Sequence, residues 1–275
     1  MARKENLRRS AIFHDYYSRL KAIAVTVFEW EDLPETCNAR FLEDCLFHEG
    51  HAIFVEDSDM RYLNLKVVPS GTLNHYNDPL SYRAYSTGYD KDYDADKCVY
   101  IRSNPLAKST ESTLIIYAER LARLDSAIDV NINAQKTPIL IRCEEKVRSS
   151  LEAVYNQYEG DRPVIIGSKA LSEHPFETLR TDAPFVADRL REEKRQVWNE
   201  ALEFLGINTN PADKKKERLI VNEVDSNNEQ IESQFAAMLS ERQKACEKIN
   251  KLYGLNVSVR KRIKNESEVE VEGDE

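Results

Sequence analysis

"TLIIYAERLARLDSAIDVN", residues 113–131, carries the clearest secondary-structure signal in the sequence. Its apolar side chains recur every three or four residues, which is the spacing of one face of an α-helix. The stripe consists of Leu114, Tyr117, Ala118, Leu121, Leu124 and Ile128, with Glu119, Arg120, Arg123 and Asp129 largely off it. This pattern predicts a long amphipathic helix that buries one face.

Other segments on both sides of this stretch carry helix signals, either the same spacing or residues that favour helix ends. They are 13–28 after a Ser10 cap, 38–47 before Gly50, 184–206 with proline first and glycine last, and about 230–253 before Gly254. The helix over 184–206 is unusually charged, because "DRLREEKRQ" contains only Leu190 as an apolar residue.

Between the first helices and residue 104 the sequence changes to short β-prone runs separated by polar loops. The runs are "HAIFVE", "RYLNLKVVP", "YRAYST" and "KCVYIR", which predict a small antiparallel sheet or barrel. Further on, "TPILIR", a helix at about 144–158 and "PVIIG" form a β-α-β stretch, and "LNVSVRKRI" alternates like a last strand that returns to the earlier sheet.

The net charge of −9 is concentrated at one end of the chain. Residues 265–275, "NESEVEVEGDE", hold six carboxylates and no base, and we expect this tail to be disordered. The five cysteines form no CxxC pair, which favours a reducing compartment. Because no signal-peptide pattern and no run of 18 apolar residues occurs, we expect a soluble protein, assembled in a cytoplasm, without a membrane partner.

Motifs for catalysis and cofactor binding are missing. The sequence has no GxxxxGK[ST] or GxGxxG loop and no GxSxG turn, so we expect no ATP hydrolysis, no catalytic residues and no cofactor. Cys45, His48 and His51 stand three residues apart, but Gly50 interrupts the segment and no fourth ligand is nearby. We therefore expect no metal site and no enzyme, although the abundant carboxylates leave an acid-base pair open.

Three basic clusters remain as candidate binding residues. They are Arg3, Lys4, Arg8 and Arg9; Arg180, Arg189, Arg191, Lys194 and Arg195; and Lys214, Lys215, Lys216 and Arg218. By residue type alone, such clusters are more often solvated faces than binding sites.

Several stretches are more specific than these charges. They are "VFEWEDLP", "NAQKTPILIR", "VYNQYEG", "TDAPFV", "VWNE" with "FLGI", "KKKER", "NNEQIES" and "ACEKINKLYGLNV". Together they resemble the head-tail connector (portal, or upper collar) of small protein-primed podoviruses that infect Gram-positive bacteria. The resemblance is close over 131–257, good in the first helix and loose over 35–110.

This resemblance implies an α+β fold of the phage portal type, with long stem helices, a small α/β clip subdomain and an SH3-like β wing. The implied parts are a wing at 1–110, stem helices at 111–136 and 183–207, a clip at 137–182, a mobile tunnel loop at 208–229, a wide-end helix at 230–254, a strand returning to the wing at 255–264 and the tail at 265–275.

The resemblance also implies a homo-dodecameric ring at one vertex of a virion, between head and tail, that passes double-stranded DNA during packaging and ejection. Its implied partners are the major capsid protein, a lower collar or tail protein, a packaging ATPase and a packaging RNA. Residues facing DNA would be Arg180, Arg189, Lys214, Lys215, Lys216 and Arg218, and residues facing the RNA would be Arg3, Lys4, Arg8 and Arg9.

Two other interpretations stay open at the level of sequence. One is a monomeric or dimeric nucleic-acid-binding module that uses the Lys214–Lys216 loop as an ordinary binding patch. The other is a metal-dependent enzyme around Cys45 and His48.

Overall fold

The computed structural model describes residues 2–135, 139–143, 164–168, 176–178, 184–207 and 221–262, and the side chains of 9–135, 184–207 and 233–262. The chain forms two compact units. The first unit contains Met1–Arg120 and Val197–Glu275, and the second contains Leu121–Gln196. The structure thus mixes helices and sheets, as expected, and each unit is described by itself below.

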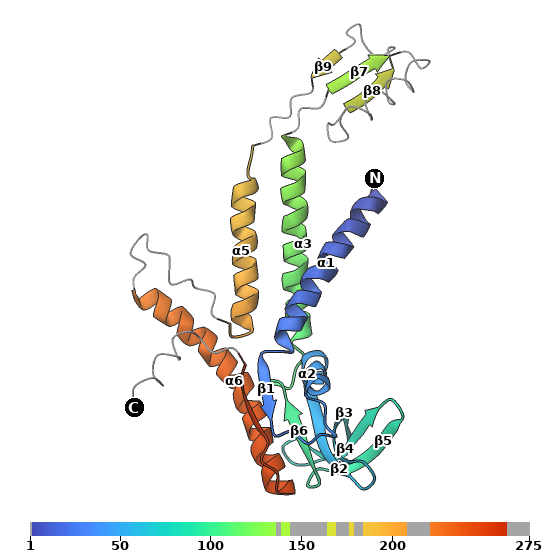
Figure 1. The fold of residues 1–275 in the computed structure, drawn as a ribbon, viewed down its shortest axis with the longest axis vertical. Coiled ribbons are helices and arrows are strands. Elements are labelled where there is room, and N and C mark those ends of the chain that lie inside the picture. The colour runs from blue at the N-terminus through green and yellow to red at the C-terminus, as the bar shows by residue number, and fades with distance from the viewer. Residues whose placement is uncertain are drawn as a thin grey trace. The chain divides into compact units, whose positions relative to one another are not determined.

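A five-stranded antiparallel sheet forms one part of the first unit (Figure 1). Its strands run in the order β5-β4-β3-β2-β6. They are β2 (His51–Asp57), β3 (Arg61–Leu73), β4 (Pro79–Ser86), β5 (Tyr89–Asp94) and β6 (Cys98–Arg102). Although β4 and β6 are not neighbours in the sheet, Tyr82 and Tyr100 stack with ring centroids 5.0 Å apart. The sheet therefore curves strongly, while the SH3-like topology stays a prediction.

The strand β5 was missed because its sequence, "YDKDYD", is poor in apolar residues. Two alternate side chains of β5 nevertheless bind the same carboxylate. Tyr89 and Lys91 both donate hydrogen bonds to the buried carboxylate of Asp57, at 2.7 and 2.6 Å. The bond from Lys91, followed by that from Tyr89, holds the pKa of Asp57 below its usual range.

The N-terminal helix α1 spans Ala2–Ala24, so the expected start after Ser10 and the expected end at Phe28 are both wrong. Residues 2–9 are mostly good helix formers, which explains the early start. The β-branched run that begins at Val25 disfavours helix, and Phe28 instead opens the strand β1 (Phe28–Glu31). The Thr26 hydroxyl donates to the Ala22 carbonyl at 2.8 Å at this end.

The last strand, β10 (Ser258–Lys261), pairs antiparallel with β1, with Phe28 opposite Lys261. The chain thus returns to residues 1–110 as expected, but to a separate two-stranded ladder rather than to the five-stranded sheet.

Two more helices complete the core of the first unit. The helix α2 (Ala39–His48) begins at Asn38, whose side chain accepts a hydrogen bond from the Phe41 amide, and ends just before Gly50. The helix α6 (Val221–Tyr253) lies beside β6 and β10 (Figure 1). The core between them contains Val27, Phe28, Leu42, Leu46, Phe54, Ile101, Phe235, Met238, Ala245 and Ile249.

The start of α6 at Val221 corrects the expected tunnel loop at 208–229, because residues 221–229 are helical. The expectation relied on the shortage of apolar residues there. A helix that is held by packing along its later turns can, however, extend through polar sequence at little further cost. Residues 208–220 lie outside the described part of the chain.

The two predicted stem helices are α3 (Glu111–Ala134) and α5 (Ala187–Phe204). The apolar stripe of α3 is confirmed, since Leu114, Ala118, Leu121 and Ile128 are all buried. In the second unit, β7 (Ile139–Cys143) pairs parallel with β8 (Val164–Ser168) and antiparallel with β9 (Phe176–Thr178). The expected helix at 144–158 and the tail at 265–275 lie outside the described residues.

Candidate nucleic-acid interface

The helices α3 and α5 lie antiparallel to each other in both units. In the first unit, Tyr117 faces Phe204 with ring centroids 6.5 Å apart. In the second unit, Asn131 accepts a hydrogen bond from the Val186 amide at 2.9 Å and donates one to the Pro184 carbonyl at 2.9 Å. The Asn131 side chain therefore provides hydrogen-bond partners for backbone groups next to the start of α5, where the helix itself provides none.

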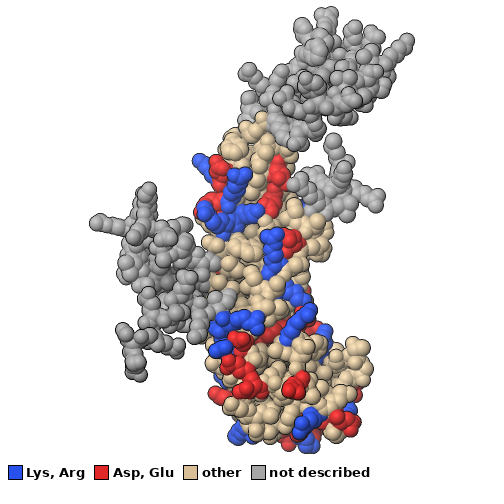
Figure 2. Space-filling view, in the orientation of Figure 1, with Lys and Arg blue, Asp and Glu red and all other residues tan. Residues whose placement is uncertain are grey.

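Most of the described basic side chains on these helices already have acidic partners. Lys194 contacts Asp125 at 2.6 Å, and Arg120 contacts Glu200 at 3.1 Å. Arg195 pairs with Glu192, and Arg191 lies 3.9 Å from Asp188. Figure 2 accordingly shows basic and acidic side chains intermingled on the visible face rather than gathered in one basic patch.

Arg189 differs from its neighbours on α5. Its side chain is exposed, and we find no ion pair for it among the described residues. A guanidinium without an intramolecular partner can contact a phosphate without first breaking an ion pair, and its planar shape favours two parallel hydrogen bonds. The residue is therefore the described member of α5 best suited to an external anion.

The other predicted site residues are only partly visible. Arg9 is exposed on α1, and Arg3, Lys4 and Arg8 lie on the same helix, in turns whose side chains are not described. The remaining five, Arg180, Lys214, Lys215, Lys216 and Arg218, lie outside the described residues. Arg189 is thus the one predicted DNA-facing residue that the structure describes, and the grouping of the six stays a prediction.

The structure does fix the point from which the lysine segment leaves α5. Gly206 follows the helix with φ +77°, and a Cβ atom added there would lie 2.4 Å from the Phe235 ring on α6. The Gly206 carbonyl accepts a hydrogen bond from Lys261 at 2.8 Å. Helix α5 therefore ends in close contact with α6 and β10, immediately before residues 208–220.

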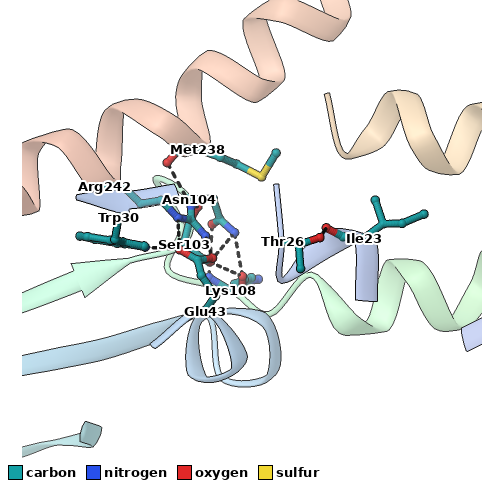
Figure 3. A network of polar contacts seen from close by, with 9 residues as sticks. All are labelled: Ile23, Thr26, Trp30, Glu43, Ser103, Asn104, Lys108, Met238 and Arg242. Atoms are coloured by element: carbon teal, nitrogen blue, oxygen red, sulfur yellow. Dashed lines mark hydrogen bonds and ion pairs between the residues drawn. The ribbon is translucent and has the colours of Figure 1, made fainter. Parts of the chain in front are cut away.

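A buried ion pair holds α6 in place within the first unit (Figure 3). The Arg242 guanidinium donates to both carboxylate oxygens of Glu43 on α2, at 2.9 and 2.8 Å. It also donates to the carbonyl oxygens of Ser103 and Met238, and Trp30 donates to Glu43 at 2.8 Å. Both side chains of the pair are only 4% exposed.

This ion pair was missed by sequence reasoning, although one signal existed. Arg242 interrupts the apolar stripe of α6 between Met238 and Ala245, and a charge at a core position implies a buried partner. Local spacing could not identify that partner, because Glu43 lies 199 residues away.

The helix α1 is held by a second polar network at its contact with α2 and α3. Glu111 accepts from the Tyr17 hydroxyl and pairs with His48 Nδ1 at 2.9 Å. Lys21 contacts His48 Nε2 at 2.8 Å and Asp44 at 2.7 Å. Partial burial of Glu111 acts to raise its pKa, but the hydrogen bonds from Tyr17 and His48 outweigh it, and its pKa is lowered.

The residues of the alternative metal-site interpretation are Cys45, His48 and His51. Cys45 is buried, and burial raises the pKa of its thiol to about 11, whereas metal binding needs a thiolate. His48 faces Glu111, and His51 lies beyond Gly50 on β2. Among the described residues there is no group of three or more His, Cys, Asp or Glu that could hold a metal ion. Nor is any described helix long and apolar enough to cross a membrane.

Comparison with known proteins gives one family match and several similar structures. A family model described as Phage Connector (GP10) matches residues 1–265. A chain in the portal and tail of native bacteriophage P68 is 16% identical, with 98% of this chain and 92% of that chain covered and a TM-score of 0.52.

Two further structures are more distant. A chain in the virion of a native gene transfer agent particle is 13% identical, covering 94% of this chain and 82% of that one, with a TM-score of 0.47. An HK97 family phage portal protein from Corynebacterium diphtheriae is 8% identical, covering 93% and 94%, with a TM-score of 0.46. Of the three, the P68 chain exceeds 0.5, and at its low identity it shows a shared fold.

Proposed function

The chain belongs to the phage connector family, whose model matches residues 1–265, and is a portal protein of a phage virion; on this basis we propose that it forms a homo-dodecameric ring around a channel for double-stranded DNA. The ring would stand at one vertex of the capsid, and the genome would pass through it during packaging and ejection. As the family assembles in the virion, its members are oligomers with capsid and tail partners.

The observation that carries the channel proposal is the charge arrangement on the antiparallel helices α3 and α5. Their described basic residues are mostly neutralised by nearby carboxylates, and Arg189 is exposed without an ion pair among the described residues. Duplex DNA carries one negative charge per ~1.7 Å of helix axis. A ring repeats each free cation once per subunit, so one arginine per chain becomes a circle of positive charge.

A channel lined mostly by paired charges, with few free cations, suits a duplex that must slide. Strong or sequence-specific contacts would stop the DNA, whereas a few phosphate contacts give weak binding that is independent of sequence and screened by salt. We propose that Arg180, Arg189 and Arg218 together with Lys214, Lys215 and Lys216 supply these contacts. The lysine segment follows the fixed end of α5 at Gly206, which would give each subunit the same point of departure.

The remaining partners are also proposals that follow from the family. We propose a packaging ATPase as the motor, since the chain itself would catalyse no reaction. A packaging RNA would contact Arg3, Lys4, Arg8 and Arg9. These four residues share α1, which the Tyr17–Glu111 contact attaches to α3 in the first unit.

The proposal is tested by imaging the purified protein and measuring its DNA binding. We expect annular particles in negative stain and salt-dependent retention of duplex DNA. Replacing Lys214, Lys215 and Lys216 together with alanine should leave the rings intact and weaken retention. A matched control removes three lysines elsewhere, Lys66, Lys97 and Lys108, and should retain DNA like the parent protein.

Two results would contradict the proposal. A monomer at micromolar concentration would exclude the ring and favour a separate nucleic-acid-binding module. Loss of rings in the triple lysine variant, with its fold intact by circular dichroism, would place these lysines in a subunit interface instead of the channel.

A further inference from the structure

A groove of about 470 Å³ opens between α1, β1 and α2 within the first unit. Its walls carry apolar surface from Ala22, Val25, Phe28 and Trp30. The Trp30 ring contributes its apolar part, because its N–H already donates to Glu43. An apolar concave surface of this size is large enough to receive one or two large side chains.

The charges around this groove are not balanced. Of its two acidic residues, Glu43 is neutralised by Arg242, and Asp44 pairs with Lys21 at 2.7 Å. Arg40 and Arg262 also line the groove and are exposed, and neither has an ion pair among the described residues. The groove therefore has an apolar floor, formed by the apolar side chains just named, and two exposed arginines that could pair with an acidic group of a partner.

A complementary feature lies in the same unit, at the tip of the hairpin that joins β3 to β4. Three large apolar side chains are exposed there, with exposed fractions of 55% for Leu73, 86% for Tyr76 and 51% for Leu80. Asp78 is exposed beside them. Exposed aromatic residues with a polar end are typical anchors of protein interfaces.

The hairpin tip is held rigidly by its own hydrogen bonds. The Asn74 side chain accepts hydrogen bonds from the amides of Tyr76 and Asp78, at 2.8 and 2.9 Å. The Asn74 amide donates to the Asp78 carbonyl at 2.8 Å, and Asn77 adopts φ +63° to close the turn. A turn fixed in advance loses little entropy on binding, which favours a role as an inserted element.

We infer that the hairpin tip of one copy, with Tyr76 as its anchor, inserts into the α1–β1–α2 groove of the neighbouring copy. The apolar residues of the tip match the apolar floor, and Asp78 matches Arg40 and Arg262, which have no ion pair among the described residues. Two different, complementary patches on one chain create head-to-tail contacts, which build a closed ring when the rotation between neighbouring copies closes. The inference rests on the proposed ring and names one of its subunit contacts.

The first test truncates the anchor. Tyr76→Ser should weaken subunit association by roughly 30-fold or more, as for a central aromatic hot spot, while the monomer keeps its circular dichroism spectrum. Leu106→Ser is the matched control, since Leu106 is 75% exposed and lies outside the hairpin. Association is measured by sedimentation over a dilution series.

A second test uses charge reversal. Asp78→Arg and Arg40→Glu should each weaken association, and the two changes combined in one chain should restore part of it. A benzophenone amino acid at position 76 should form cross-links between copies, and the linked peptide should come from residues 18–44 or contain Arg262. Cross-links to any other segment, or rings that tolerate both Tyr76→Ser and Asp78→Arg, would overturn the inference.

These outcomes separate the contact from the proposed function. If the unmodified protein forms rings but the hairpin variants do so equally well, only the hairpin contact is wrong. If the unmodified protein forms no ring, the ring and this contact both fail.

Discussion

Two ion pairs in this chain have short N–O distances and differ in their burial. In the first unit, Arg242 and Glu43 are each 4% exposed, with N–O distances of 2.8 and 2.9 Å. In the second unit, Lys194 and Asp125 lie 2.6 Å apart, with side chains 33% and 24% exposed. The buried pair has protein carbonyls as further partners, and the second pair is partly open to solvent.

The difference shows how one chain can use charge both as a fixed joint and as an adjustable surface. A buried pair cannot exchange partners, because each ion would be left uncompensated in a medium of low polarity. An exposed pair contributes little to stability and can exchange its partner for water, salt or a phosphate. Fixed charges therefore hold α6 to α2, and exchangeable charges cover the helices proposed to face DNA.

The strongest test of this comparison removes the buried cation. Arg242→Met should cost about 3–5 kcal/mol in free energy of unfolding, because Glu43 stays buried without its partner. The measurement is urea unfolding followed by circular dichroism. Lys244→Met is the matched control, since its pair with Glu241 lies on the same helix with Lys244 59% exposed, and it should cost under about 1 kcal/mol.

A double variant sharpens the result. Arg242→Met combined with Glu43→Leu should recover much of the loss, because replacing both ions of a buried pair by apolar groups is often close to neutral. The Trp30 N–H loses its acceptor in this variant, so the recovery should be incomplete. Equal costs for Arg242→Met and Lys244→Met would mean that burial does not distinguish the two pairs.

The second test concerns the junction between the packed core and the lysine segment. Gly206→Ala should destabilise the chain for two reasons. Alanine disfavours the left-handed backbone of this position, and its Cβ would lie 2.4 Å from the Phe235 ring. Gly88 has the same φ of +77° with nothing within 4 Å, so Gly88→Ala measures the backbone strain alone. We expect about 1 kcal/mol for Gly88→Ala and about 1–3 kcal/mol more for Gly206→Ala.

Thermal unfolding of both glycine variants gives the comparison directly. Equal losses at the two positions would show that α5 does not end against Phe235 as the structure has it. In that case the departure point of the lysine segment would not be fixed.

The parts of this fold that could be predicted from sequence are those in which local spacing and packing agree. The stripe of α3 is an example, since Leu114, Ala118, Leu121 and Ile128 recur at helical intervals and are buried. The cap at Asn38 and the stop at Gly50 similarly place α2 correctly. In these elements each residue meets its own local preference, so the sequence alone is informative.

The parts that were missed depend on partners far away along the chain. The strand β5 gains its place from Asp57, which binds Tyr89 and Lys91 more than thirty residues away. Arg242 is acceptable in a core stripe only because Glu43 is opposite. For the candidate site, the sequence correctly placed Arg189 on a helix but could not show that its neighbours are neutralised by acids on α3 and α5.

The smallest expected effect is the difference between two substitutions on α5, Arg189→Ala and Lys194→Ala. Lys194→Ala and Arg189→Ala should each change the free energy of unfolding by less than about 1 kcal/mol, because Arg189 is exposed and Lys194 is partly exposed. Their effects on DNA should differ. Arg189 has no ion pair among the described residues, whereas Lys194 is engaged by Asp125.

Each cation–phosphate contact that is lost reduces the magnitude of the slope of log K against log salt by about 0.9, and a ring repeats the substitution in every subunit. Filter binding of duplex DNA to purified rings at several salt concentrations should therefore show a smaller slope for Arg189→Ala and an unchanged slope for Lys194→Ala. An equal reduction in both variants would mean that the Asp125 pair opens freely and that a phosphate replaces the carboxylate. The Lys194–Asp125 pair would then belong to the DNA-binding surface itself. Of the two pairs compared, the buried Arg242–Glu43 pair would be the one that keeps its partner.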